Sequence, residues 1–360
     1  MSIKRILVTG AGGSPGVNFI KSLRHAPEEY HVVAVDANLH HLQWPDADRK
    51  FLVPPCSHPD YLDILNQIIA VEKIDLVHAQ PDIEVRAISA SRDRIHAKTY
   101  LPPHATIETL QDKYLTGKLW ASAGIRSRPT AVVDSLSDIT SASAEFGFPF
   151  WMRASSGAGA RGSTLVTNQE VAVHWLSYWR ARGEDWQFIA EEYLPGRDIA
   201  WSSLWENGQL ITSQGRERLE YIYPHLAPSG RTGTPIVART LNDAAVNEIA
   251  MRCVLAVDLK ATGIFSVDLR EDRDGRPIPT EINCGRFFTT SFFFTQAGLN
   301  MPYLYVKKAF GEEIPVTPQL NALPPGLHWI RHIDCPTVLI REEDLSCDIP
   351  CPQHSQLIAA

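Results

Sequence analysis

The stretch GIFSVDLREDRDGRPIPTEINCGR, residues 263–286, carries oxygen-bearing side chains at a spacing that suits a divalent cation. Asp274–Gly275 predicts a two-residue hairpin turn, because both residues adopt a positive φ more readily than most. A hairpin centred on this pair places Asp268 directly opposite Glu281, and the two-residue period of a strand puts Asn283 on the same face. Because opposed carboxylates repel each other and these oxygens suit a hard cation, we expect a Mg²⁺ site, with Mn²⁺ as an alternative metal. The competing interpretation is a solvated acidic hairpin, which the apolar neighbours in both strands disfavour.

A second stretch, RASSGAGARGS over residues 153–163, lies between two apolar segments and is rich in small residues. Small side chains let backbone N–H groups approach phosphate oxygens closely. Arg153 at the start of the stretch supplies a cation that does not lose its proton. The GxxxxGK[ST] pattern of a P-loop is missing, so the stretch predicts phosphate binding of another kind, and a plain glycine-rich linker is the alternative.

The N-terminal stretch ILVTGAGGSPG, residues 6–16, runs from an apolar segment through glycines into a helical pattern. Asp36 ends the next predicted strand about twenty residues on, where a dinucleotide-binding fold has its ribose-binding acid. This pattern alone favours an NAD(P)-dependent oxidoreductase similar to short-chain dehydrogenases. Such an enzyme also needs a Ser, Tyr and Lys set. Ser291, Tyr303 and Lys307 have a plausible spacing but lie too late in the chain for that single-domain fold.

The elements that position these residues alternate regularly in the first hundred residues. The apolar patterns predict strands at 5–10, 31–36 and 75–81 and helices at 16–25, 61–72 and 82–96. Strands that alternate with helices at this spacing form a parallel sheet with right-handed crossovers. We therefore expect an α/β N-terminal domain.

The following residues predict a mixture of helices and strands. We expect helices at 108–122, 135–146, 169–182 and 242–257 and strands at 128–133, 185–196, 263–270, 276–283 and 328–334, with two strands around a loop at 148–166. The pattern indicates short strands and loops over 198–240, and the aromatic run 287–294 indicates core. This order of elements is typical of an α+β fold.

Composition narrows the class of protein. The chain has 360 residues, 44% hydrophobic and 21% charged, so two or three globular domains are expected. Its net charge of −7 disfavours a nucleic-acid or anionic-membrane partner, and no run of about 18 apolar residues predicts a membrane span. The N-terminus shows no signal peptide and the six cysteines are scattered, so we expect a cytoplasmic protein. A zinc site is the weaker interpretation of one C-terminal group, because no CxxC pair is present: Cys335, Cys347, Cys351 and His354.

Three further stretches complete the pattern, and they are QDKYLTGKLWASAGIRSRP (111–129), AEEYLPGRD (190–198) and SGRTGTPIVARTL (229–241). Together with residues 148–166 and 263–286, and in this order, they resemble the ATP-grasp superfamily of ligases. The likeness covers about residues 1–312. It is strongest to one ATP-grasp half of the carbamoyl-phosphate synthase large chain with the αβα domain that precedes it, and weaker to biotin carboxylase and D-alanine–D-alanine ligase.

The resemblance implies a role for each residue that matches a family motif. The implied ATP contacts are Lys113, Arg153, Ser155, Ser156, Gly157, Gly159, Arg161, Gly162, Glu191, Glu192, Leu194 and Asp198. Of these, Glu191, Glu192 and Leu194 would hold adenine, partly through backbone groups, and Asp198 would hold the ribose. The implied metal ligands are Asp268, Glu281 and Asn283, and the implied catalytic residues are Arg286 and Arg231. The expected acceptor contacts are Gly12, Gly13 and Ser14, because backbone N–H groups at a helix N-terminus can receive an anionic group of the substrate. The family's Glu-x-Asn-x-Arg pattern is interrupted, since Arg286 comes one residue late.

The resemblance also implies an architecture and an activity. We expect a pre-ATP-grasp, Rossmann-like domain at 1–105, the two parts of an ATP-grasp fold at 106–190 and 191–312, and a C-terminal extension at 313–360. The N-terminal domain of this superfamily generally binds no dinucleotide and helps to form the substrate site. The expected activity is ATP-dependent joining of a carboxylate to an amine, or to a thiol, through an acyl phosphate, with release of ADP and phosphate. The substrates would be small molecules, and a homodimer is one possible assembly. The alternative functions are an oxidoreductase and a nucleotide-binding protein without catalysis.

Overall fold

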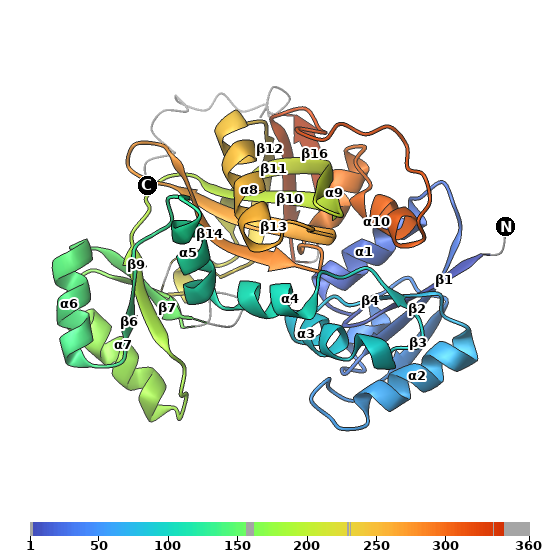
Figure 1. The fold of residues 1–360 in the computed structure, drawn as a ribbon, viewed down its shortest axis with the longest axis horizontal. Helices are drawn as coiled ribbons and strands as arrows, with labels where there is room; N and C mark the ends of the chain where they lie inside the picture. The colour runs from blue at the N-terminus through green and yellow to red at the C-terminus, as the bar shows by residue number, and fades with distance from the viewer. Residues whose placement is uncertain (1–2, 156–161, 229, 231, 334, 342–360) are drawn as a thin grey trace.

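The computed structural model describes residues 3–155, 162–228, 230, 232–333 and 335–341. These residues form a five-stranded, a seven-stranded and a four-stranded sheet. Figure 1 shows the five-stranded sheet (blue) at one end of the molecule, the four-stranded sheet (green) at the other, and the seven-stranded sheet between and above them. The two cores at the five-stranded sheet extend into the seven-stranded sheet, whereas the four-stranded sheet has a core of its own. The boundaries at residues 105, 190 and 312 stay a prediction.

The N-terminal sheet is parallel and has the order β3-β2-β1-β4-β5, so the predicted α/β domain is confirmed. Its strands are β1 (Lys4–Val8), β2 (Tyr30–Asp36), β3 (Arg49–Leu52), β4 (Leu76–His78) and β5 (Lys98–Thr99), and its helices are α1 (Ser14–Arg24), α2 (Tyr61–Glu72) and α3 (Asp82–Ala90). The apolar pattern misses β3 and β5, because their sequences RKFL and KT are short and largely polar.

Successive residues of each strand point to opposite faces of this sheet, and each face packs into a different core. Leu7 of β1 packs into one core with Leu65 of α2. Its neighbour Ile6 packs into a second core with Phe19 of α1, and that core continues to Phe287 near the seven-stranded sheet. Both faces are therefore covered, as a parallel sheet requires.

The seven-stranded sheet pairs antiparallel and has the order β14-β13-β10-β11-β12-β15-β16. Its strands are β10 (Asp198–Glu206), β11 (Gln209–Tyr221), β12 (Pro235–Leu241), β13 (Gly263–Glu271), β14 (Pro277–Cys284), β15 (Leu327–His332) and β16 (Cys335–Arg341). The prediction of short strands over 198–240 is wrong for β10 and β11, which form one long hairpin. Asn207 and Gly208 make its turn with φ of 50° and 81°. An Asn-Gly pair is a strong hairpin signal that a search for apolar runs passes over.

One face of the seven-stranded sheet is apolar, and the opposite face, called the charged face below, carries the charged side chains around Asp268. Trp201 of β10 and Val267 of β13 belong to the core that includes residues of α5 (Lys113–Ser122) and α8 (Ala244–Val257). The next residue along β13 is Asp268, which faces the opposite side because successive strand residues alternate. This second face carries the candidate site.

The predicted helix at 108–122 is two helices, α4 (His104–Gln111) and α5. Asp112 lies between them and caps α5, since its Oδ1 accepts the backbone N–H groups of Tyr114 and Leu115 at 2.9 and 3.0 Å. The break makes Lys113 the first residue of α5. Its backbone N–H donates to Ser155 O at 3.2 Å, so Lys113 lies beside the glycine-rich stretch.

The four-stranded sheet has the order β6-β9-β7-β8. Its strands are β6 (Thr130–Val133), β7 (Phe150–Ala154), β8 (Thr164–Val166) and β9 (Phe188–Glu192), and its helices are α6 (Leu136–Phe146) and α7 (Gln169–Ala181). Phe150, Phe188 and Ile139 form part of its separate core. The antiparallel pair β7–β8 confirms the two strands that were predicted within 148–166.

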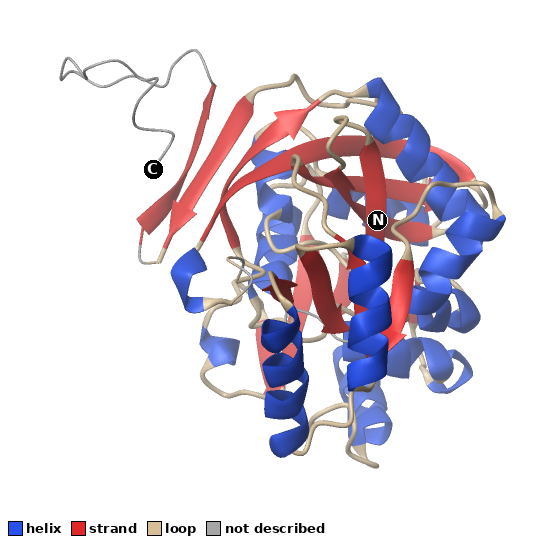
Figure 2. Cartoon of the chain, turned by 90° about the vertical axis from the view of Figure 1, so that its left-hand side faces the viewer, coloured by secondary structure: helices blue, strands red, loops and turns tan. Residues whose placement is uncertain are grey.

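The aromatic run 287–294 is buried, as predicted. Four of its side chains are buried in the core that includes α1, and they are Phe287, Phe288, Phe293 and Phe294. The run leads into α9 (Ser291–Gln296), and α10 (Met301–Ala309) follows. Figure 2 shows how the helices lie around the strands. No helix among the described residues is long and apolar enough to cross a membrane.

Candidate active site

The hairpin of β13 and β14 places the three predicted metal ligands on one face. Asp268 pairs directly with Glu281 across the two strands, as predicted. Asn283 lies two residues further along β14 and pairs with Ser266. The two-residue period therefore puts the three oxygen-bearing side chains on the same side of the sheet.

The turn of this hairpin differs from the prediction. The Asp272 N–H donates to Arg276 O at 3.0 Å, so a three-residue loop closes the hairpin in place of the predicted two-residue turn. Thr280 is an extra residue in β14, at a register shift opposite the Asp268–Leu269 step of β13. This bulge offsets the longer loop by one residue and returns the two carboxylates to opposed positions.

Arg218, to which the sequence motifs assign no role, binds two carboxylates of the site. Arg218 of β11 donates from Nη2 to Asp268 Oδ1 at 2.7 Å and from Nη1 to Asp198 Oδ1 at 3.0 Å. The Tyr221 hydroxyl donates to Asp198 Oδ2 at 2.6 Å. Asp198, the predicted ribose residue, thus lies beside a predicted metal ligand. The register of β10 with β11 is the signal that identifies Arg218, because it pairs directly with Asp198.

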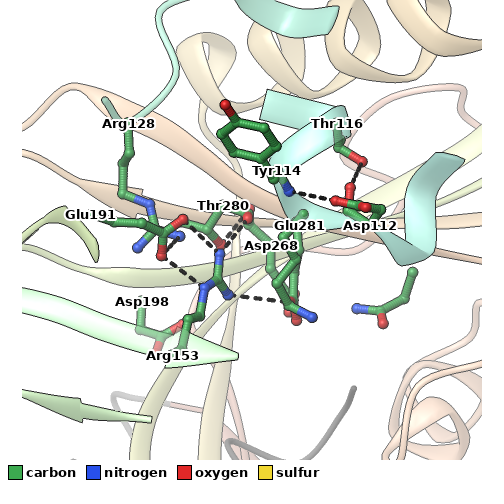
Figure 3. Close-up of polar contacts among 12 residues, drawn as sticks. Asp112, Tyr114, Thr116, Arg128, Arg153, Glu191, Asp198, Asp268, Thr280 and Glu281 are labelled. Atoms are coloured by element: carbon green, nitrogen blue, oxygen red, sulfur yellow. Dashed lines mark hydrogen bonds and ion pairs between the residues drawn. The ribbon is translucent and has the colours of Figure 1, made fainter. Parts of the chain in front are cut away.

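Arg153 lies at the centre of the site (Figure 3). Its guanidinium lies 2.7 Å from Glu191 Oε2 and 3.3 Å from Glu281 Oε2, and it donates to Thr280 O at 3.1 Å. Arg128, just before β6, lies 3.0 Å from the same Glu191 oxygen. Two guanidiniums therefore occupy the buried Glu191 carboxylate, which disfavours a contact of this side chain with adenine.

Several of these residues line a cavity of about 140 Å³. The predicted residues on its wall are Arg153, Leu194, Asp198, Asp268 and Glu281, and the others are Arg128, Trp151, Tyr193, Arg218, Leu269, Arg270 and Thr280. A cavity of about 800 Å³ adjoins it and shares Asp198, Arg218 and Arg270. Five described residues that are predicted to bind ATP line neither cavity, and they are Lys113, Ser155, Gly162, Glu191 and Glu192. Lys113 Nζ nevertheless lies 3.5 Å from Glu281 Oε2.

The two opposed carboxylates have different electrostatic surroundings. Burial and repulsion by Glu281 and Asp198 raise the pKa of Asp268, although Arg218 attracts its charged form. Burial acts the same way on Glu281, but four cations hold the pKa of Glu281 well below its usual range, and they are Lys113, Arg153, Arg218 and Arg286. Convergent cations of this kind suit a chain of phosphates. The two carboxylates and the amide oxygen of Asn283 are a donor set that Mg²⁺ prefers, so the residues fit the expected metal.

Arg286 contacts one of the predicted metal ligands despite its shifted position. Gly285 takes a φ of 75°, so the chain turns directly after β14. Arg286 Nη2 then donates to Asn283 Oδ1 at 2.7 Å, and its Nε donates to Asp82 at the start of α3. The turn thus accommodates the additional residue before Arg286. Through its two contacts, Arg286 connects the candidate metal ligand Asn283 with α3 of the N-terminal domain.

The glycine-rich stretch is described only at its two ends. Ser155 is buried and its N–H donates to Gln187 O at 2.9 Å, and Gly162 O accepts the indole N–H of Trp175 at 2.9 Å. The predicted residues Ser156, Gly157, Gly159, Arg161 and Arg231 lie outside the described residues, as do Cys347, Cys351 and His354 of the alternative zinc site.

In the N-terminal turn, other groups of the chain take the places that a dinucleotide would need. Asp36 Oδ2 accepts the Gly12 N–H at 3.0 Å, and Asp36 Oδ1 accepts another backbone N–H two residues on. A Cβ at Gly12 would lie 2.4 Å from the carbonyl of His41, so the segment after β2 packs directly against the turn. The Gly13 N–H donates within the turn at 3.2 Å. This geometry disfavours a dinucleotide, and it leaves Ser14 as the predicted acceptor contact whose N–H the turn does not use.

The Ser, Tyr and Lys set of the alternative oxidoreductase does not assemble at this turn. The Tyr303 hydroxyl and Lys307 Nζ both donate to Glu28 Oε1, at 3.2 and 2.9 Å. Lys307 Nζ also lies 2.8 Å from Glu312. These contacts are an ion-pair cluster between α10 and the N-terminal sheet.

Comparison with known proteins supports this architecture. Residues 6–100 match the family described as PylC-like, N-terminal domain. D-alanine–D-alanine ligase of Pseudomonas entomophila (strain L48) is 25% identical over 177 residues, which are 48% of this chain and 54% of that protein. The chain therefore spans about half the length of the curated relatives that it matches.

Two solved structures share the fold over most of the chain. N5-carboxyaminoimidazole synthetase from Staphylococcus aureus, complexed with ADP, has a TM-score of 0.71 and 17% identity over 92% of this chain and 83% of that one. The biotin carboxylase domain of Hydrogenobacter thermophilus 2-oxoglutarate carboxylase, solved with MgADP and bicarbonate, has a TM-score of 0.70 and 17% identity over 92% and 74%. Both confirm the predicted fold class.

Proposed function

We propose that this chain, which has the ATP-grasp fold, is an ATP-dependent ligase that joins a carboxylate to an amine and releases ADP and phosphate. The observation that carries the proposal is the pair of opposed carboxylates, Asp268 and Glu281, on the wall of the smaller cavity. Lys113, Arg153 and Arg286 converge on Glu281. The names of relatives support it, because the D-alanine–D-alanine ligase is a ligase and the two solved structures hold ADP or MgADP. A thiol is the second candidate for the acceptor.

The cleft would hold the nucleotide with its phosphates toward the opposed carboxylates. Leu194 and Asp198 line the wall where the base and the ribose are proposed. Arg153 and Lys113, both close to Glu281, would hold the phosphate chain. Glu281, together with the other two proposed ligands, would hold Mg²⁺, which would neutralise the negative charge of the phosphates.

The reaction would run in two steps. A carboxylate oxygen attacks the γ-phosphorus and the bond to the β-phosphate oxygen breaks, which gives an acyl phosphate and ADP. The amine nitrogen then attacks the acyl carbon, phosphate leaves with its bridging oxygen, and the amine loses a proton. Arg286, oriented by Asn283 and Asp82, would neutralise charge on the transferring phosphoryl group, and Arg231 is proposed for the same role. No side chain has to form a covalent bond.

Calorimetry with the whole chain tests the nucleotide. We expect it to bind ATP with Mg²⁺ and to show no tight binding of NAD. Tight NAD binding without ATP binding would favour the oxidoreductase instead. A release assay for ADP over pairs of small carboxylates and amines then tests turnover, and a chain that binds ATP but turns over none of them would support a nucleotide-binding protein without catalysis.

A further inference from the structure

The charged face of the seven-stranded sheet continues past the nucleotide cleft. Arg216 and Arg218 lie two residues apart on β11, so both face the same side. On the far side of β12, Trp329 of β15 pairs with Ala238, which itself pairs with Arg218. Arg331, two residues beyond Trp329, therefore also belongs to this face. These three guanidiniums therefore lie on the same face of the sheet.

Arg218 and Arg216 differ in their counter-charges. Arg218 is held by two carboxylates, as described above. Arg216 is only 3% exposed, and among the described residues it forms no ion pair. Its Nη1 donates to Thr290 Oγ1 at 2.6 Å, its guanidinium carbon lies 3.7 Å from the Phe288 ring centroid, and its buried Nε has no hydrogen-bond partner. Burying a guanidinium without an anion is costly, so this position calls for one.

Arg331 presents a second guanidinium of the same kind. Its Nε donates to Pro235 O at 3.1 Å and its guanidinium carbon lies 4.9 Å from the Trp329 ring centroid. Its Nη2 is buried and has no hydrogen-bond partner. Burial and the nearby charges of Arg218 and Arg331 lower the pKa of Arg216 to about 9. Neither guanidinium forms an ion pair with a carboxylate in the part of the chain that the structure describes, and two cations that repel each other are stabilised when an anion binds both.

The distance to the proposed reaction centre fits a small molecule. Arg216 pairs with Ala200, and Ala200 pairs with Asp268 on the next strand. Two strand spacings, roughly 10 Å, therefore separate the Cα atoms of Arg216 and Asp268. A molecule of a few bonds held at Arg216 would reach a phosphate held near Asp268.

We propose that Arg216 and Arg331 bind a carboxylate of the substrate that takes no part in the reaction. At least one of the two joined molecules is then an amino acid or a dicarboxylic acid. Guanidinium N–H groups match the two oxygens of a carboxylate, and each of these two residues has one nitrogen to spare. This inference rests on the proposed ligase function, and it adds the class of its substrate.

Calorimetric titration of the whole chain with malonate tests the site directly. The chain is first saturated with the ATP analogue AMP-PNP and Mg²⁺, so that the phosphate positions are filled. We expect millimolar binding of malonate to the wild type and at least tenfold weaker binding to Arg216→Gln and Arg331→Gln. Arg239→Gln is the matched control, because Arg239 lies in the same sheet but is held by Glu217 at 3.0 Å, and it should bind malonate like the wild type.

Three outcomes would overturn the inference: no binding of malonate to the wild type, unchanged binding in both arginine variants, or an equal loss in Arg239→Gln. Tighter binding of inorganic phosphate than of malonate would contradict the choice of a carboxylate. Arg331→Gln keeps the test valid if Arg216→Gln does not fold, because Arg331 is only partly buried. Failure of AMP-PNP to bind would count against the proposed function instead, and malonate titrated without nucleotide would still test the two arginines.

Discussion

Asp268 and Glu281 face each other across β13 and β14, yet each carboxylate lies against a different cation. Asp268 accepts from Arg218 at 2.7 Å, whereas Glu281 lies 3.3 Å from Arg153 and 3.5 Å from Lys113. The pair is therefore compensated from two sides of the cleft. Loss of either carboxylate removes one of the anions that neutralise these buried cations, so we expect stability to depend on both.

Neutralising this pair should remove the proposed metal site. We expect Asp268→Asn combined with Glu281→Gln to weaken ATP binding in the presence of Mg²⁺ by at least about tenfold and to abolish ADP formation, because two of three metal ligands lose their charge. Calorimetry and an ADP-release assay measure the two effects, with circular dichroism to show that the chain folds. Asp274→Asn is the control, since Asp274 lies in the exposed loop of the same hairpin. Unchanged turnover in the double variant would refute the assignment.

Glu191 and the adjacent Glu192 offer a second matched pair. The Glu191 carboxylate lies between Arg128 and Arg153, and all three side chains are buried. Glu191→Gln should therefore destabilise the four-stranded sheet by about 3–5 kcal/mol, because it removes the carboxylate that Arg128 contacts and leaves Arg153 with the more distant Glu281. Glu192→Gln, at a half-buried position, should cost much less. Urea denaturation compares them, and equal stability of the two variants would show that Glu191 is not the structural partner.

In the hairpin at 263–286, the sequence alone predicts the common face of the candidate metal ligands but not the details of the turn. The two-residue period places Asp268, Glu281 and Asn283 on one face, and no other part of the chain is needed for that step. The predicted turn is one residue too short, and the bulge at Thr280 cancels the error. A bulge depends on how the finished strands fit, which the residue types around it do not indicate.

The cations around this hairpin were harder to predict, because they come from distant strands. Arg218 lies 50 residues from Asp268 in the chain, and only the register of β11, β10 and β13 brings them together. Arg128 likewise lies within the stretch 111–129, whose resemblance to the family assigns it no role. The alternation of strands and helices, in contrast, was sufficient for the N-terminal sheet, since each βα unit is a local pattern.

Glu84 of α3 should give the chain a distinctive pH dependence. Burial raises its pKa from 4.5 to about 7, and repulsion by Asp36 acts in the same direction. Because the folded pKa is the higher one, the folded state holds a proton that the unfolded state has lost between pH 4.5 and 7. The stability from this group is complete below pH 4.5 and is lost as the pH rises through 7.

Glu84→Gln removes this titration. Relative to the wild type, the variant should gain stability as the pH rises from 5 to 8, by about 1–3 kcal/mol over that range. Urea denaturation at several pH values measures the difference between the two proteins, in which the contributions of other groups such as His78 cancel. A difference that stays constant from pH 5 to pH 8 would contradict the raised pKa.

Alanine substitutions at Gly12 and Gly13 distinguish a structural role of the N-terminal turn from a role in ligand binding. A Cβ at Gly12 would lie 2.4 Å from the His41 carbonyl, whereas a Cβ at Gly13 would meet nothing closer than 3.5 Å. Gly13 also has a φ of −72°, which any residue adopts. Gly12→Ala should therefore cost about 1–3 kcal/mol of stability, as overpacking does, and Gly13→Ala should cost little. Thermal unfolding compares the two variants, and calorimetry with ATP and Mg²⁺ should give Gly13→Ala the affinity of the wild type. A large loss of ATP affinity in Gly13→Ala would mean that the nucleotide contacts this turn after all, because the substitution changes little there besides the space open to a ligand.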